Sequence, residues 1–340
     1  MDILNQTQFP FLEFESKTPN ARRFHTLVVE AAFAITPDGL VQTDHDAVSI
    51  ENTYTGEPGR SSLTWEAPLA PFKRATDIHV HAVTRTPKPL REWLARVRVG
   101  SIEKRLRVRG PHVWRHRDGA WQRTLPQPCR EVPICYELAF GGGYEHEGES
   151  VLFEENPYGT GWIHEHTPTD SEIAAPQVIA ADEPEHEPGK TYRPQGLLPI
   201  APSWEPRLSR AGTLDEQWEA ERWPLLPRDF SYWHYSSASP GLVCRGYLRG
   251  DESVELENLG MPGITRWSLP GLSPMALMRY ADDQVMPRVL LLDTVHIDVV
   301  QWRMRLVWRC IFPHEPAPNL IVIIDPSRES AHPPAERPHG

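Results

Sequence analysis

Residues 75–87, ATDIHVHAVTRTP, carry the spacing Asp-x-His-x-His at Asp77, His79 and His81. Residues two apart on a strand point to the same face, so His79 and His81 could bind one metal ion together. A zinc site needs three or four ligands. A second pair, His164 and His166, stands in WIHEHTP. These four histidines define one hypothesis, a metal-dependent hydrolase.

The elements around this segment do not favour a barrel hydrolase. Such an enzyme needs helices that alternate with its strands, but Pro87, Pro89 and an alternating Arg/Val run follow instead. We therefore interpret His79 and His81 as residues of an ordinary strand. For Asp77 we expect a structural role, either capping a turn or pinning a loop, because Asp readily accepts hydrogen bonds from nearby backbone N–H groups.

Other catalytic signals are weak. The sequence has no Gly-x-Ser-x-Gly, and the three glycines at 141–143 lack the spacing of a phosphate loop. Cys135 lies in an apolar, strand-like context, which favours a buried thiol over a nucleophile. We predict no catalytic residue, no metal and no cofactor, and so no enzyme.

Composition excludes several classes of protein. The 340 residues include 35 prolines and 12 tryptophans, which predicts short strands, many turns and long ordered loops. The net charge of −11 argues against a nucleic-acid binder. The N-terminus does not resemble a signal peptide, no apolar run is long enough to insert stably in a membrane, and no Cys-x-x-Cys occurs. We expect a cytoplasmic protein with reduced thiols.

Charge is segregated along the chain. Residues 74–130 hold 14 Lys and Arg against 4 Asp and Glu, whereas residues 145–190, here the acidic segment, hold 1 against 12. Within the basic part, RVRVGSIEKRLRVRG alternates apolar residues with arginine, which predicts a hairpin that turns at Gly100-Ser101. The outward arginines, here the arginine stripe, are partner-binding candidates: Arg96, Arg98, Arg105, Arg107 and Arg109.

Three interpretations of the arginine stripe stay open. It docks an acidic protein, it holds the acidic segment of the same chain, or it is a solvated face of a sheet. Binding of nucleic-acid phosphates is disfavoured by the overall acidity.

The run DFSYWHYSSASPGL has neither a helical nor a strand period, so its consecutive aromatic residues cannot all face a core. Tyr232, Trp233 and Tyr235 are therefore further partner-binding candidates. The alternative is a loop tucked over the core.

The sequence predicts one helix, in the run AGTLDEQWEAERWPLLP. Thr213 and Glu216 have the spacing of a capping box, with Thr213 as the N-cap, and Trp218 marks the apolar side. We assign a structural role to these three residues and to Asp229, which stands in the run PRDF.

The motifs APFKRATDIHV, VGSIEKRLRVRGPHVW, EVPICYELAFGG, ENPYGTGW and LSRAGTLDEQW follow one another in a specific order. Over roughly residues 20–310 the chain resembles a bacterial family of domains of unknown function, number two-one-six-nine of that series. The resemblance implies a cytoplasmic adaptor or chaperone that helps to load toxic effectors onto the type VI secretion spike. The partners it implies are an effector and the spike or spike-tip proteins.

We therefore predict a mostly-β, sandwich-type fold with long ordered loops and one or two short helices. Residues 1–318 form one large β-rich domain with two possible lobes, 1–140 and 195–318, which an acidic loop region at 141–194 joins. Residues 319–340 form a flexible tail. The predicted function is a non-enzymatic adaptor, with the metal-dependent hydrolase and a structural subunit of the secretion machinery as alternatives. The sequence does not indicate an oligomeric state.

Overall fold

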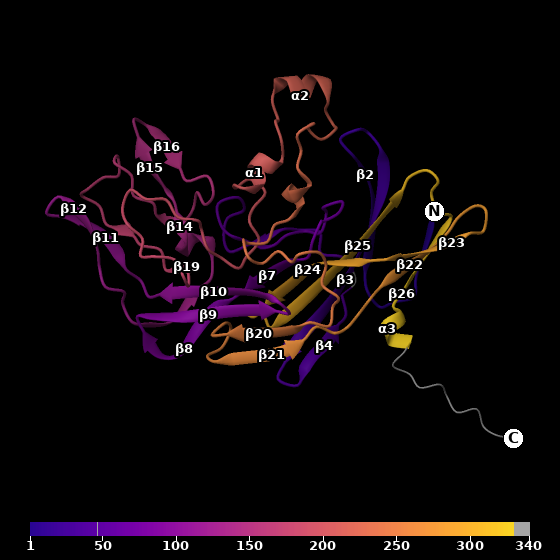
Figure 1. The fold of residues 1–340 in the computed structure, drawn as a ribbon, viewed down its shortest axis with the longest axis horizontal. Helices are drawn as coiled ribbons and strands as arrows, with labels where there is room; N and C mark the ends of the chain where they lie inside the picture. The colour runs from indigo at the N-terminus through magenta and orange to yellow at the C-terminus, as the bar shows by residue number, and fades with distance from the viewer. Residues whose placement is uncertain (46, 330–340) are drawn as a thin grey trace.

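A computed structural model describes residues 1–45 and 47–329, and strands dominate it (Figure 1). This confirms the predicted mostly-β class. The helical elements are one or two turns long, and none that the structure describes is long and apolar enough to cross a membrane. They are α1 (Arg207–Arg210), α2 (Glu216–Glu221), α3 (Pro326–Glu329) and the 3₁₀ turns η1 (Tyr136–Leu138) and η2 (Tyr232–Tyr235).

The largest sheet has six strands. Its order is β2 (Phe11–Lys17), β3 (Arg23–Thr36), β25 (Arg303–Pro313), β24 (Leu291–Asp298) and β7 (Asp77–His81), with β4 (Gly39–Thr43) on β3. Strand β7 carries the Asp-x-His-x-His segment and runs parallel to β24, whereas the other pairs are antiparallel.

Two further sheets form the opposing layer. The five-stranded one has the order β19 (Val178–Ala180), β10 (Ile102–Arg109), β9 (Glu92–Val99), β20 (Ser253–Glu257) and β21 (Ile264–Ser268). The four-stranded one has the order β1 (Asp2–Asn5), β26 (Leu320–Ile324), β22 (Met275–Arg279) and β23 (Val285–Val289). One continuous hydrophobic core takes buried side chains from all three sheets, as a sandwich requires.

The Arg/Val alternation forms the predicted hairpin. Val99 pairs with Ile102 across a turn at Gly100, whose φ of 56° suits glycine. Val97, Leu106 and Val108 point into the core, because alternate residues of a strand face opposite sides.

The remaining strands form small sheets. They are β11 (Val113–Arg117), β12 (Ala120–Arg123) and β18 (Ile173–Ala174) in one sheet, and the pairs β8 (Val83–Leu90) with β13 (Cys129–Pro133), β14 (Phe140–Gly141) with β17 (Thr160–Gly161), β15 (Gly143–His146) with β16 (Glu149–Leu152), and β5 (Thr53–Tyr54) with β6 (Leu63–Trp65).

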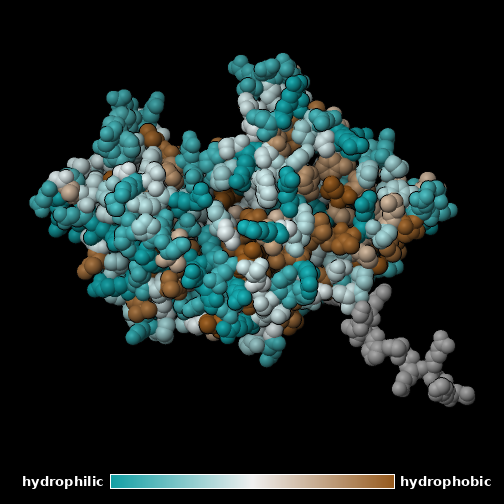
Figure 2. Space-filling view, viewed as in Figure 1, coloured by the Kyte–Doolittle hydropathy of each residue, from teal (hydrophilic) through white to brown (hydrophobic). Residues whose placement is uncertain are grey.

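The region 141–194, expected as an acidic loop, thus supplies several short strands, of which β19 completes the edge of the five-stranded sheet. The β15–β16 hairpin and the segment around α2 project from the body in Figure 1, and both projections are mostly hydrophilic in Figure 2, whereas apolar side chains gather over the middle of that face.

The flexible tail predicted for residues 319–340 starts too early in the sequence, because it includes a strand. Residues 320–324 form β26, a central strand between β1 and β22, and α3 follows it. The run LIVII is β-branched and apolar, and its alternate residues Ile321 and Ile323 are fully buried. Residues 330–340 lie outside the described part of the chain.

The predicted helix exists, but its cap is different. Asp215, not Thr213, is the N-cap of α2, and its carboxylate accepts a hydrogen bond from the Trp218 backbone N–H at 2.8 Å. Thr213 instead donates its backbone N–H and its hydroxyl to Asp229, at 3.1 and 2.8 Å. The Thr-x-x-Glu spacing therefore does not mark a capping box, and Thr213 joins the residues just before the helix to Asp229.

Candidate functional site

The two histidines of β7 differ in their surroundings. His79 is fully buried, and its Nε2 lies 3.1 Å from the Ser237 hydroxyl. Burial, together with the nearby charge of Lys73, lowers the pKa of His79 to about 3, so His79 is neutral. His81 is half-buried, and its Nδ1 lies 3.1 Å from Asp298 on the neighbouring strand.

The four-histidine metal site does not assemble. His164 and His166, together with Glu165, bring three possible ligand atoms within 4.8 Å of one another, but no such group among the described residues includes His79 or His81. The hydrolase hypothesis based on the Asp-x-His-x-His segment therefore lacks its ligand set in the part of the chain that the structure covers.

A second group, Glu15 with His25 and His314, also brings three ligand atoms within 4.8 Å.

Asp77 lies in a buried cluster of hydrogen bonds at the start of β7. It is fully buried, pairs with Lys73 at 2.7 Å, and accepts hydrogen bonds from the Ser236 hydroxyl at 2.5 Å and the Ser237 backbone N–H at 2.9 Å. Burial alone opposes its ionisation, but the Lys73 charge and these donors hold the pKa of Asp77 below its usual value. Asp77 and His79 thus fasten the chain directly after η2.

This segment is the end of the aromatic run. Within that run η2, here called the aromatic turn, directs its rings to different neighbours. Tyr232 packs on Phe72 at a centroid distance of 4.8 Å, and Tyr235 packs on Phe230 at 5.2 Å. Trp233 is 40% exposed and lies under the Arg74 guanidinium, 5.8 Å from the ring centroid. Of the three predicted aromatic contacts, only Trp233 is an exposed ring; the two tyrosines are half-buried.

Trp233 lies in the wall of a hollow of about 810 Å³, here the groove. Its apolar lining includes Trp233, Ile200 and Val243. Two acids, Glu155 and Glu205, and five arginines also line it. The arginines are Arg74, Arg193, Arg207, Arg210 and Arg245.

One of these arginines is structural. Arg207 is buried, pairs with Glu66 at 2.7 Å, and donates to the carbonyls of Ile200 and His234. It therefore ties α1 to the aromatic turn. The other four guanidinium groups have no carboxylate within 4.0 Å among the described residues, so their charge is available to a partner.

The arginine stripe is the opposite case, because most of its charge is already paired. Arg96 contacts Glu103, Glu255 and Glu257. Arg105 lies 3.6 Å from Glu103, and Arg98 donates to the Gly100 carbonyl. Partner binding by the stripe remains a prediction, but the structure gives these arginines acceptors within the chain.

The acidic segment accounts for the rest of the stripe. Glu185 contacts Arg107, Arg109 and Arg123. Arg109 is buried, and its Nε also lies 2.6 Å from a carboxylate oxygen of a second acid, Glu92. Burial opposes ionisation of Glu185, but the bonds from Arg109 and Arg123 lower its pKa to about 2. Of the interpretations left open, the structure therefore supports docking of the chain's own acidic segment.

Cys135 is not a nucleophile in this setting. Burial and the adjacent Glu137 raise the pKa of its thiol to about 12, so the reactive thiolate is absent at neutral pH. All four cysteines are unpaired, and Cys310 is buried.

Comparison with known proteins identifies the family of the chain. A family model described as an uncharacterised protein conserved in bacteria, DUF2169, matches residues 20–309. The chain belongs to this family. The DUF2169 match covers Asp77, the aromatic turn and the whole lining of the groove. No curated protein and no solved structure matches the chain.

The sequence did not reveal the arginines of the groove. Arg74, Arg193, Arg210 and Arg245 are scattered over 172 residues, counting from 74 to 245, and none stands in a periodic pattern. The only local signal is Arg74, which lies in the motif KRATD beside the pinned strand.

Proposed function

We propose that this protein is a cytoplasmic adaptor that binds a type VI secretion effector and helps to load it onto the spike complex. The observation that carries the proposal is the groove, where an exposed tryptophan lies among four arginines without carboxylate partners. The role in secretion rests on the family resemblance. The proposal that the site binds a protein rests on the chemistry of the groove.

The groove selects the kind of segment that it binds. A solvent-exposed Trp and neighbouring Arg are the residue types that dominate binding energy at protein interfaces. Unpaired arginines attract carboxylates, and the apolar lining takes hydrophobic side chains. The client segment is therefore acidic and carries apolar residues.

The test is a charge reversal with a matched control. We expect Arg74→Glu/Arg245→Glu to abolish co-purification of the effector from the native cell and to block that effector's secretion. The control is Arg98→Glu/Arg105→Glu, which reverses two exposed arginines of the stripe and should leave both readouts unchanged. Circular dichroism checks that both variants are folded.

Two outcomes oppose the proposal. If the groove variant captures and exports the effector as well as the wild type, the groove is not the client site. If the protein stays in the assembled secretion apparatus after loading, it is a structural subunit and not an adaptor.

A further inference from the structure

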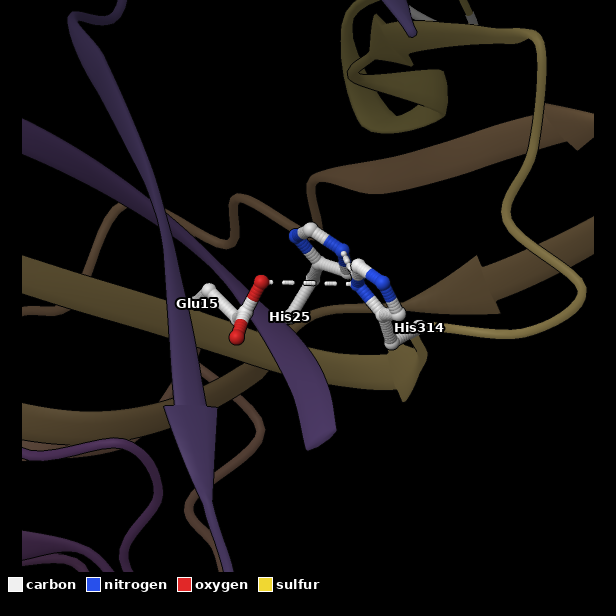
Figure 3. A group of neighbouring side chains, drawn as sticks. All are labelled: Glu15, His25 and His314. Atoms are coloured by element: carbon white, nitrogen blue, oxygen red, sulfur yellow. Dashed lines mark hydrogen bonds and ion pairs between the residues drawn. The ribbon is translucent and has the colours of Figure 1, made fainter. Parts of the chain in front are cut away.

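Three side chains converge at one end of the six-stranded sheet (Figure 3). Glu15 stands on β2, His25 on β3, and His314 directly follows β25. The Nε2 of His25 lies 2.9 Å from the Nδ1 of His314, and that Nδ1 lies 3.5 Å from Oε2 of Glu15. All three possible ligand atoms lie within 4.8 Å of one another.

The register of the sheet brings them together. Glu15 pairs directly with His25, and His25 pairs with Phe312 on the next strand. His314 is two residues beyond Phe312, which places it on the same face of the sheet. The His25 ring stacks between Phe312 and His314, at centroid distances of 5.2 and 5.1 Å. Rigid strands, rather than loops, therefore hold two of the three groups.

A fourth residue fixes the tautomer of His25. Its Nδ1 lies 2.5 Å from a carboxylate oxygen of Glu13, which can only accept a hydrogen bond when ionised. The Nδ1 must then carry the proton, which leaves a lone pair on Nε2, the atom that faces His314. Carboxylate–histidine pairs of this kind orient the imidazole ligands of metal ions.

Glu15 keeps lone pairs free for a metal ion. The guanidinium group of Arg23 donates one hydrogen bond to each carboxylate oxygen of Glu15. A carboxylate has about four lone-pair directions on its two oxygens. Arg23 takes one on each oxygen and leaves the others open.

The spacing of the ligand atoms fits a small metal ion. Ligands bound at about 2.0–2.1 Å in a tetrahedron lie roughly 3.3 Å apart. The His25–His314 separation of 2.9 Å and the His314–Glu15 separation of 3.5 Å fall on either side of that value. We propose that Glu15, His25 and His314 bind a first-row divalent metal ion such as Zn²⁺, with Glu13 as the group that orients His25. Three protein ligands leave one coordination position to water.

Family membership does not imply this site. Glu15 and His314 both lie outside the matched residues 20–309. The site is also distinct from the groove, so its test does not depend on the proposed function.

The test is a Zn²⁺ titration against a chromogenic chelator. The background variant is His164→Ala/His166→Ala, which removes the other histidine group. We expect it to bind one Zn²⁺ per chain. His314→Ala and His25→Ala should each lose binding by at least about 100-fold, and Glu13→Gln should weaken it by about 10–100-fold, as loss of an orienting carboxylate does. The control His116→Ala alters a histidine whose ring makes an edge-on contact with Trp121 and should bind as the background does.

A second readout covers variants that fold poorly. Co²⁺ bound to the background protein should give visible absorption bands of tetrahedral nitrogen and oxygen ligation, and these should vanish with His314→Gln, which keeps a side chain of similar size. The proposal is overturned if the background protein binds no Zn²⁺, or if His314→Ala and His314→Gln bind it as tightly as the background. In that case the two histidines share only a hydrogen bond.

Discussion

Asp77 is the residue that links the strand segment to the candidate site. It is buried with a lysine, and it holds the residues after the aromatic turn through Ser236 and Ser237. A buried ion pair of this kind contributes little when intact, but loss of one partner leaves an uncompensated charge in the core.

We predict that Asp77→Ala lowers the free energy of unfolding by about 3–5 kcal/mol, because Lys73 would lose its counter-charge inside the protein. The measurement is urea unfolding at neutral pH. Asp251→Ala is the control, since Asp251 pairs with Arg249 at the surface and its loss should leave the free energy of unfolding nearly unchanged. Equal losses in the two variants would contradict the role of Asp77.

The sequence predicted that Asp77 caps a turn or pins a loop, but it did not predict the partners of Asp77. Local chemistry favours such a role, because Asp at the start of a strand favours backbone donors. Two groups that donate hydrogen bonds to Asp77 lie 159 and 160 residues away, at Ser236 and Ser237. No local pattern encodes a contact of that range. For the same reason the sequence did not reveal the proposed metal ligands, since strand pairing is what brings Glu15 and His314 together.

Among the elements, strand β10 carries an unusual inward residue. Lys104 is buried, and its ammonium group donates to the Ser239 hydroxyl at 2.8 Å and the Pro240 carbonyl at 2.9 Å. Burial lowers the pKa of Lys104 to about 7. The residue fastens β10 to the segment that runs from the aromatic turn into the groove wall.

This lysine predicts a pH dependence of stability. An unfolded lysine has a pKa of about 10.4, so between pH 7 and that value the unfolded state binds a proton that the folded state lacks, and stability rises with pH. Relative to Lys104→Met, the wild type should gain about 2 kcal/mol between pH 7 and 9. Other titrating groups contribute to both proteins and cancel.

Urea unfolding of the two proteins at both pH values measures this difference. We also expect Lys104→Met to be the more stable protein at pH 7, because it buries no charge. A difference that stays constant or falls as the pH rises argues that Lys104 keeps an ordinary pKa in the folded state.

The elements themselves were predictable where the pattern was periodic. The alternation of valine and arginine predicted the β9–β10 hairpin and its turn, because only one face of a strand reaches the core. The cap of α2 was misplaced, because Thr213 and Asp215 are both good N-caps and the choice depends on Asp229, 16 residues away from Thr213. Strand β26 was missed because it is short and followed by a Pro-rich polar end.

For the whole molecule, the distribution of unpaired charge decides where a partner binds. The sequence places its densest positive charge on the arginine stripe, whereas the structure neutralises most of the stripe with Glu185 and the acids of β20. Four arginines without carboxylate partners among the described residues come together in the lining of the folded groove.

Client binding should therefore depend on salt through the groove. We predict that the dissociation constant of the effector rises as ionic strength rises, and that Arg74→Gln/Arg245→Gln reduces this salt dependence, because exposed charges are screened over about 8–10 Å. Titrations at several salt concentrations give the slope. An unchanged slope in that variant, beside a reduced slope in Arg98→Gln/Arg105→Gln, would return the partner site to the stripe.

The order of strands in the sheets also determines when the two sheets can be completed during synthesis. Strand β25 lies between β3 and β24, and β26 lies between β1 and β22, so two strands that are synthesised late occupy the middle of two sheets. Strand β3 lacks its partner β25 until residue 313 has emerged, and β1 lacks its partner β26 until residue 324 has emerged. Apolar residues of β3 such as Leu27 and Val29, buried in the folded protein, must therefore stay soluble while the chain between β3 and β25 is made, and a truncation that removes residues 320–324 deletes a central strand.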